Sequence, residues 1–294
     1  MSTPRWPLTP RAFRVLLCWL ALLGLWEAAY RIIGWHSWVF PAPSHVLDAS
    51  LSMLGRETHF GDAIHAGWPF EPVTGGGRPA TSGARSFFGS PLVVAILLSA
   101  FRLVLGFLLS IVLGLGLGVC MWRYGFINAM LGPVFLGLQT LPSVCWVPLA
   151  ILLLGLSEWG ILFVLVMGSF FAIAITLRDG LHATPPIYQA AGRVFGARGM
   201  SFYLYVMLPA GLPALASSLR SGFSFAWRSL MGAELIFVLK RHGLGHLLSI
   251  GRDFGDIAQV VAVMVVMVLI GMAVDRVAFA RLERRIRRRF GLET

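Results

Sequence analysis

A stripe of two arginines and three serines lies within an otherwise apolar stretch in the second half of the chain. Its members are Ser217, Arg220, Ser221, Ser224 and Arg228. Their spacings of three and four residues place all five side chains on one face of a helix. A polar face is costly against lipid, so we expect it to face a bundle interior, a second copy of the chain or a water-filled path. Because arginine offers paired planar donors to oxyanions, such a path would suit an anion. The alternative is a buried network with Glu234 or Asp275 that holds a dimer together.

Two further groups of ionisable side chains lie close to apolar runs. Asp275 is near the end of the last run, and we expect it to pair with Arg276, Arg281 or a residue of another helix. His242 and His246 are four residues apart, but glycines lie between them. We therefore expect no metal site at the two histidines.

Motifs that carry catalysis or bind nucleotides are missing from the sequence. There is no HExxH, no GxSxG and no paired carboxylate motif, and the acidic residues of the apolar runs are scattered. There is also no GxxxxGK[ST] loop to hold ATP phosphates. The nearest glycine cluster, Gly114–Gly118, lacks the lysine and favours close helix packing. We expect no catalytic residue, no cofactor and no nucleotide site of the chain's own.

The elements that must position the stripe follow from composition. The 294 residues are 57% hydrophobic and only 13% charged, far below the charged share of about a quarter in soluble domains. A membrane-spanning helix needs about 20 apolar residues. Six runs qualify, namely 13–33, 92–122, 134–156, 161–177, 212–239 and 257–280. The sequence thus predicts an all-α, polytopic membrane protein with a single domain, 1–294. The third run is the least regular, because its prolines at 133, 142 and 148 invite kinks.

The arrangement of basic residues predicts the orientation, since cytoplasmic segments carry more Lys and Arg. With the N-terminus inside, thirteen basic residues are cytoplasmic: Arg5, Arg11, Arg14, Arg123, Arg178, Arg193, Arg198, Arg281, Arg284, Arg285, Arg287, Arg288 and Arg289. Six lie outside: Arg56, Arg78, Arg85, Lys240, Arg241 and Arg252. Both termini are therefore expected in the cytoplasm. The basic tail 281–294 would lie against anionic lipid headgroups, and we expect no nucleic-acid partner.

Two segments between the runs stand out. The external loop 34–91 includes a glycine- and proline-rich insertion, about 55–90, which we expect to be flexible. The segment 179–210 is amphipathic and basic, and Thr184-Pro185-Pro186 resembles a helix start with threonine as its cap. Gly196 permits a turn, and a second short helix, about Met200–Met207, is expected to end at Leu208-Pro209 before Pro213 opens the next run. The prediction is a helix–turn–helix on the cytoplasmic surface.

This segment carries a family resemblance. Permease subunits of bacterial ATP-binding-cassette importers share the cytoplasmic signature Glu-Ala-Ala, three residues, Gly, nine residues, Ile-x-Leu-Pro. The segment fits this spacing without a gap, at Ala190, Ala191, Gly192, Gly196, Val206, Leu208 and Pro209. It departs from the signature where Ala190 replaces the glutamate, Gly192 an alanine and Val206 the isoleucine.

Other features resemble the nitrate, sulfonate and taurine branch of this family. They are Leu25-Trp26-Glu27, Phe40-Pro41-x-Pro43, Arg102–Gly106, and Asp275 with Leu282-Glu283-Arg284-Arg285. The resemblance implies a permease homodimer in the bacterial inner membrane, with two copies of a cytoplasmic ATPase and an external substrate-binding protein. It also implies a path for a small solute such as nitrate, a sulfonate or taurine, and contact with the ATPase through Ala190, Ala191, Gly192, Gly196, Leu208 and Pro209. The alternatives are a secondary transporter or a membrane-embedded enzyme.

Overall fold

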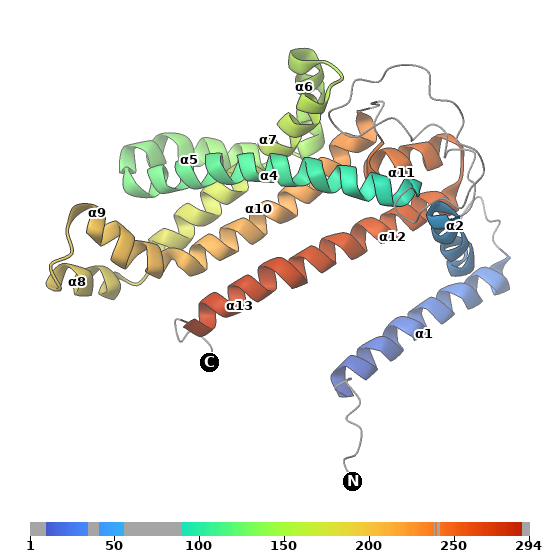
Figure 1. Cartoon of the computed structure of the whole chain (residues 1–294), viewed down its shortest axis with the longest axis horizontal. Coiled ribbons are helices and arrows are strands. Elements are labelled where there is room, and N and C mark those ends of the chain that lie inside the picture. Colours follow the sequence, from blue (N-terminus) through green and yellow to red (C-terminus); the bar gives the residue numbers. More distant parts are fainter. Residues whose placement is uncertain (1–9, 35–40, 56–89, 238, 240–241, 290–294) are drawn as a thin grey trace, which may run out of the picture.

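The computed structural model describes residues 10–34, 41–55, 90–237, 239 and 242–289, and within these ranges the chain is helical with no strand (Figure 1). The flexible insertion expected at 55–90 lies almost wholly outside the described residues. The helices are α1 (Pro10–Ile33), α2 (Pro43–Gly55), α4 (Pro91–Arg123), α5 (Gly125–Thr140), α6 (Trp146–Leu154), α7 (Glu158–His182), α8 (Pro186–Val194), α9 (Gly199–Phe202), α10 (Leu208–Ile236), α11 (Leu244–Asp253), α12 (Ile257–Val274) and α13 (Ala280–Arg289). Three short turns link some of them: η2 (Ser143–Cys145), η3 (Tyr203–Met207) and η4 (Asp275–Phe279).

Helix α7 is the centre of the structure and packs against both α4 and α10. It is apolar around most of its circumference, which is typical of a helix with neighbours on several sides. Glycines on α4 allow the close approach, since a Cβ on Gly114 would lie 2.7 Å from Ile173 Cβ, and one on Gly118 would lie 2.8 Å from the Ala174 carbonyl. The prediction that this glycine cluster serves helix packing is confirmed for Gly114 and Gly118.

The third expected span, 134–156, is broken. Helices α5 and α6 are related by a bend of 98° around Leu141-Pro142. Proline cannot donate a backbone hydrogen bond and restrains the residue before it to an extended conformation, and Leu141 has φ −66° and ψ 125°. The kink predicted from the prolines is therefore present, and Figure 1 shows α6 standing away from the long helices.

The second helix of the segment 179–210 does not end where the sequence predicted. The chain stays helical from Gly199 to Ile236, passing through the π-helical turn η3 into α10. Leu208 and Pro209 are the first residues of α10, and Pro213 lies inside it. Proline is tolerated in a first helical turn, and the wider turn of a π-helix changes the hydrogen-bond register just before Pro209. The expected stop at Leu208-Pro209 is wrong.

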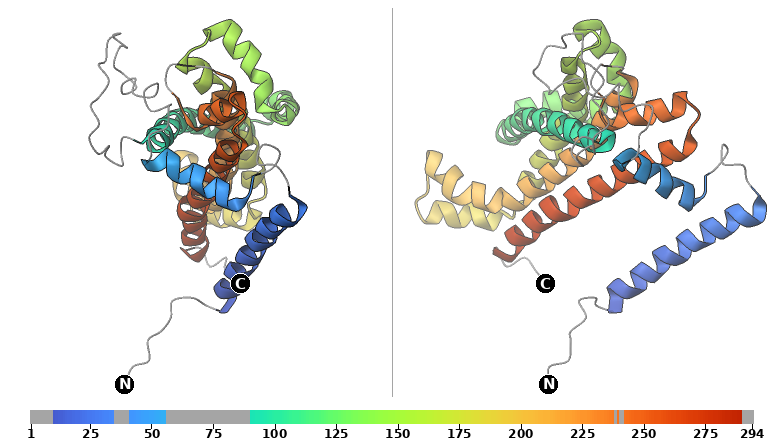
Figure 2. Two further views of the ribbon diagram at one scale, coloured as in Figure 1. Left: turned by 90° about the vertical axis from the view of Figure 1, so that its right-hand side faces the viewer. Right: turned by 45° about the vertical axis from the view of Figure 1, so that its right-hand side comes forward.

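The two ends of the bundle carry different elements. Helices α8 and α9 and the C-terminal end of α13 lie at one end, whereas α2 and α11 lie at the other (Figures 1 and 2). Helix α1 contacts α2, where Arg31 pairs with Glu27 and the Ser44 amide donates to the same carboxylate. The segment 179–210 and the basic C-terminal helix therefore share one end.

By length and composition, three helices of the described chain are able to cross a membrane, or four if α5 and α6 form one bent span. The six-span count stays a prediction. Helix α10 is not among these helices, and its serines, arginines and glutamate lower its hydropathy. The polar stripe thus lies on a long helix that requires protein or water on that face.

Candidate functional site

Helix α8 ends in a glycine turn at the position predicted. Gly196 has φ +78°, a left-handed conformation that other residues rarely adopt. Its amide donates to the Arg193 carbonyl and the Ala197 amide donates to the Gly192 carbonyl, each at 3.0 Å. This pair of bonds is the Schellman motif, which satisfies the last carbonyls of a helix.

The start of α8 differs from its prediction. Pro185 is the residue before the first turn, and no side chain caps the helix. The Thr184 hydroxyl instead donates to the Gly180 carbonyl at 3.3 Å, because Thr184 lies one residue too early and still follows the end of α7. The cap assigned to Thr184 is wrong, although Pro186 occupies the first turn as expected.

Helix α8 packs directly on η3 through its glycine. Gly192 is buried, and a Cβ at this position would lie 2.7 Å from Val206 Cγ2 and 2.9 Å from Val206 Cγ1. Two positions that depart from the family signature are therefore in contact. A β-branched valine has a stiff χ1 and cannot easily move aside, so glycine at 192 sets how close α8 lies to η3.

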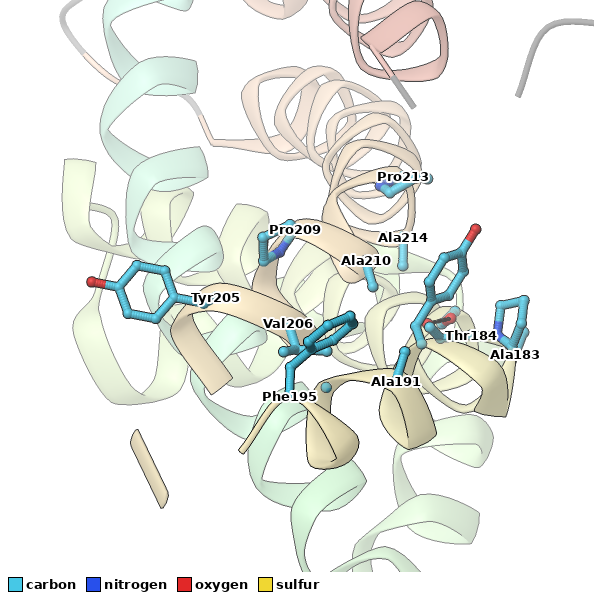
Figure 3. A pocket seen from close by; sticks show the side chains of 14 residues that line it. Ala183, Thr184, Ala191, Phe195, Tyr205, Val206, Pro209, Ala210, Pro213 and Ala214 are labelled. Carbon is cyan, nitrogen blue, oxygen red and sulfur yellow. Dashed lines mark hydrogen bonds between the residues drawn. The ribbon is translucent and has the colours of Figure 1, made fainter. Parts of the chain in front are cut away.

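A cavity of about 470 Å³ opens between α8 and the start of α10. Figure 3 shows Ala191 of α8 and Phe195, the residue after α8, facing Val206, Pro209 and Ala210 across it. Its lining is mainly apolar, with small residues and prolines. The structure thus brings Ala191, Gly192 and Pro209 to one place.

The outer surface of α8 is apolar and uncovered in the single chain. Val194 and Phe195 are 84% and 88% exposed, and Ile187 is 69% exposed. Ala190, which replaces the signature glutamate, is also exposed, as is Gly196. The side chain of Leu208 is not among those described. Exposed large apolar groups beside a shaped cavity indicate an interaction surface.

One of the two arginines in the α10 stripe, Arg220, forms an ion pair with Asp275. Arg220 Nε donates to Asp275 Oδ1 at 2.7 Å and its Nη2 donates to Asp275 Oδ2 at 2.8 Å, so the pair is bidentate. Asp275 thus pairs with a residue of another helix, which was one of the partners expected from the sequence. Glu234, the other acid considered for the stripe, pairs with Arg102 instead. Ser217 donates to the Ala214 carbonyl of its own helix. Ser221 is half-buried, and Ser224 is exposed.

Arg228 has a different environment from Arg220. Its Nε donates to the Ser224 carbonyl at 3.0 Å, and its guanidinium lies 4.6 Å from the centre of the Phe225 ring. In the described part of the chain, no carboxylate lies within ion-pair distance of Arg228. A hollow of about 410 Å³ adjoins it, lined by Phe223, Ser224, Trp227, Arg228, Gly271 and Asp275. Among the described residues, Arg228 of the stripe therefore has no carboxylate partner.

A buried ion network that the sequence did not predict joins α4, α7, α10 and α11. Arg102 donates to both carboxylate oxygens of Glu158, at 2.7 and 2.6 Å, and to Glu234 at 2.9 Å. Glu234 also accepts from the Ser99 hydroxyl and from the Gly245 amide at the start of α11. Arg102 and Glu234 are 3% and 1% exposed. An arginine inside an expected span was the available signal, since such residues are rare without a partner.

The two histidines lie beside this network, outside the expected spans. Their rings stack with centroids 4.2 Å apart. Burial, His246 and the positive charge of Arg102 lower the pKa of His242 to about 4. In the described residues, no group of three or more His, Cys, Asp or Glu side chains is placed to hold a metal. Burial also lowers the pKa of His246.

Comparison with known proteins identifies the family. Residues 106–288, well over half of the chain, match the family described as the binding-protein-dependent transport system inner membrane component. A putative ABC transporter permease protein of Methanocaldococcus jannaschii is 30% identical over 63% of this chain and 69% of its own. The nitrate import permease protein NrtB of Synechocystis sp. is 25% identical over 63% of this chain and 66% of its own. The bicarbonate transport system permease protein CmpB of Synechococcus elongatus is 24% identical over 60% of this chain and 63% of its own.

A solved structure agrees at the level of fold. The methionine ABC transporter MetNI, in inward-facing conformations, matches 66% of this chain and 95% of its own with a TM-score of 0.56 and 19% identity. The resemblance to importer permeases of the nitrate-type branch is confirmed. The chain belongs to the family of binding-protein-dependent transport system inner membrane components, which are multi-pass permease subunits of ABC importers.

Proposed function

We propose that the chain forms the translocation path for a small solute with an anionic group, such as nitrate, a sulfonate, taurine or a related compound. An external binding protein delivers the solute, and a separate cytoplasmic ATPase drives its movement. Relatives named for nitrate and bicarbonate import support an anion. The exposed guanidinium of Arg228 beside the hollow supports it from the structure, because arginine donates in pairs to oxyanions.

One observation carries this proposal. The helical segment from Gly199 to Ile236 is continuous, so η3, against which α8 packs, and the hollow at Arg228 belong to one helical element. From Leu208 to Arg228 the helix extends roughly 30 Å at 1.5 Å per residue. A displacement imposed on α8 at the cytoplasmic end would pass through Gly192 and Val206 into η3 and along α10. The helix therefore links a partner outside the membrane to the path inside it.

The exposed surface of α8 is the proposed docking site for the ATPase. Its apolar side chains, Ile187, Val194 and Phe195, give a partner buried contact area. The small residues Ala190 and Ala191 allow close approach, and Gly196 ends α8 with a left-handed turn. The chain itself acts as a transport subunit, and ATP hydrolysis is assigned to the partner.

Orientation and assembly follow the same reasoning. Exposed basic residues at the end with α8 and α13 include Arg193, Arg198, Arg281, Arg284 and Arg285. We assign this end, and both termini, to the cytoplasm. The outward face of the α10 stripe is uncovered in the single chain, and we assign a second copy of the chain to it, with the path between the two copies.

Reconstitution tests the proposal. The permease, its ATPase and the external binding protein are placed in liposomes, and uptake of labelled nitrate and taurine is measured with and without ATP. Uptake that requires ATP and the binding protein is expected. Uptake driven by an ion gradient without ATP would instead favour a secondary transporter, and chemical conversion of the solute would favour an enzyme.

A further inference from the structure

The break between α5 and α6 lies just beyond Arg228, the last residue of the stripe. A Cβ on Gly232 of α10 would lie 3.2 Å from Val144 Cγ2 in the turn η2, so these two residues are in contact. Gly232 is four residues beyond Arg228 and therefore lies on the same face of α10, about 6 Å further along the helix. The turn η2 thus crosses the face of α10 that carries the stripe.

This turn lies at a depth where a lipid-facing break in a helix is not tolerated. Arg178 near the end of α7 donates to the Asn128 side chain near the start of α5 at 3.2 Å, so α5 begins at the end of the bundle that leads to α8. The 16 residues of α5 reach at most about 24 Å from there, less than the hydrocarbon thickness of about 30 Å. Irregular backbone at this depth occurs only where it is buried in protein or lines water. Val144 is 46% exposed in the single chain, so we expect it to face water or a second copy.

Glycines on two helices let η2 pack closely. On α7, a Cβ at Gly168 would lie 3.2 Å from Ser143 Cβ, and on α10 the absent Cβ of Gly232 makes room for Val144. The contact with α10 is the one that the proposed coupling would change, because a displacement passed from α8 through η3 moves α10. The Val144–Gly232 contact therefore lies between the helix that carries the stripe and the break that covers its end.

We propose that Val144 is the outer gate of the path, which it closes by packing on Gly232 and opens when α10 moves away from η2. This inference rests on the proposed path between two copies of the chain and identifies the residue that controls entry to it. An apolar constriction stops an ion because water leaves the constriction and the ion cannot keep its hydration shell. Valine provides an apolar surface of this kind, and the glycine opposite lets it reach the backbone of α10.

A reversible cross-link tests the gate in the assembled transporter. With Cys18, Cys120 and Cys145 replaced by serine, Val144→Cys/Gly232→Cys places two thiols in contact, as a disulfide requires. Oxidation should abolish ATP-dependent uptake of labelled nitrate, because the bond holds η2 against α10. Reduction with dithiothreitol should restore uptake, which shows that the variant is folded. Labelling of the remaining free thiols measures how much of the pair is oxidised.

The matched control joins α11 and α12, away from the stripe. A Cβ on Gly251 would lie 3.0 Å from Val260 Cγ2, so Gly251→Cys/Val260→Cys pairs the same residue types at a similar spacing. Oxidation of this pair should leave uptake near its starting rate. Normal uptake by a transporter whose Val144→Cys/Gly232→Cys pair is fully oxidised would overturn the proposal, and so would an equal loss in both pairs.

Access to the stripe from outside gives a second test, which does not depend on transport. Ser224 is exposed and lies four residues before Arg228, so Ser224→Cys reports whether a reagent reaches the stripe beyond the gate. A negatively charged, membrane-impermeant methanethiosulfonate reagent is applied outside right-side-out vesicles without ATP. Val144→Ala should speed the reaction, whereas Val144→Leu, which keeps a large apolar side chain, should not. Equal rates with valine, alanine and leucine at position 144 would contradict the gate.

Failure of this inference differs from failure of the proposed function. If uptake is normal and neither the cross-link nor Val144→Ala has an effect, the gate is wrong and the proposed path stands. If the reconstituted wild-type transporter moves no anion, the proposed function fails. The rate at Ser224→Cys then still shows whether Val144 closes the stripe.

Discussion

Gly192 of α8 and Val206 of η3 are packed so tightly that a Cβ on residue 192 would lie 2.7 Å from Val206 Cγ2. In the family signature these two positions hold alanine and isoleucine. The smaller pair found here keeps α8 against the π-helical turn that leads into α10. Because α10 carries the stripe, this contact lies between the proposed ATPase surface and the proposed path.

We expect Gly192→Ala to impair coupling, because the new methyl group pushes α8 away from η3. ATP-dependent uptake should fall about tenfold, which corresponds to roughly 1.4 kcal/mol. Val206→Ala removes the obstructing methyl groups, so the double variant should recover most of the uptake. If Gly192→Ala is harmless, or if Val206→Ala gives no rescue, the packing contact does not transmit the movement.

A second prediction concerns the turn at Gly196. Gly196 has φ +78°, and a Cβ there would meet no atom within 4 Å, so only the backbone conformation opposes a side chain. Gly196→Val should therefore disturb the turn and lower binding of the ATPase, since β-branched residues are strained at positive φ. Gly196→Asn is the matched control, because asparagine tolerates this conformation. Co-purification of the ATPase is the measurement, and equal loss in both variants would point to surface contact instead of strain.

The buried network makes a prediction about stability. Arg102→Met leaves Glu158 and Glu234 without their cation, and removal of one partner of a buried ion pair costs about 3–5 kcal/mol. Glu234→Gln is milder, at about 1–2 kcal/mol, because the amide oxygen still accepts from Ser99 and Gly245 while Arg102 keeps Glu158. Thermal unfolding of the purified protein in detergent would rank the two variants. The reverse order would show that Glu234 and not Arg102 is the essential member.

Orientation is testable with single cysteines at the two ends of the bundle. On a background without native cysteines, Arg252→Cys in α11 should react with a membrane-impermeant maleimide added outside cells. Arg193→Cys in α8 should react only after the membrane is opened. The opposite pattern would place α8 outside, where no cytoplasmic ATPase reaches it.

Local features of the proposed coupling site were predictable from the sequence. The spacing of small residues, the proline at the start of α8 and the glycine at its end act within one helix, and the structure confirms the turn at Gly196. The end of the second helix was not predictable in this way. The Leu208-Pro209 pair predicts the end of a helix, but the π-helical turn before it lets the helix continue.

Long-range pairs account for most of what the sequence did not reveal. Arg220 and Asp275 are 55 residues apart, and Arg102 and Glu234 are 132 apart, so helix packing decides which partners meet. The sequence indicated that Asp275 needs a partner, and it offered Glu234 or Asp275 as partners of the stripe. In the structure Glu234 points to α4 and α11, because it lies on the buried side of α10 with Leu230 and Ala233.

The central claim is that Arg228 lines a path for an anion. Its most direct test is ATP-dependent uptake of labelled nitrate by liposomes that contain the permease, its ATPase and the binding protein. Arg228→Ala should lower uptake about tenfold or more, the equivalent of at least 1.4 kcal/mol, and Arg228→Lys should retain part of it. Cross-linking confirms that each variant still assembles as a dimer. Nitrate uptake at the wild-type rate by a correctly assembled Arg228→Ala transporter would contradict the claim.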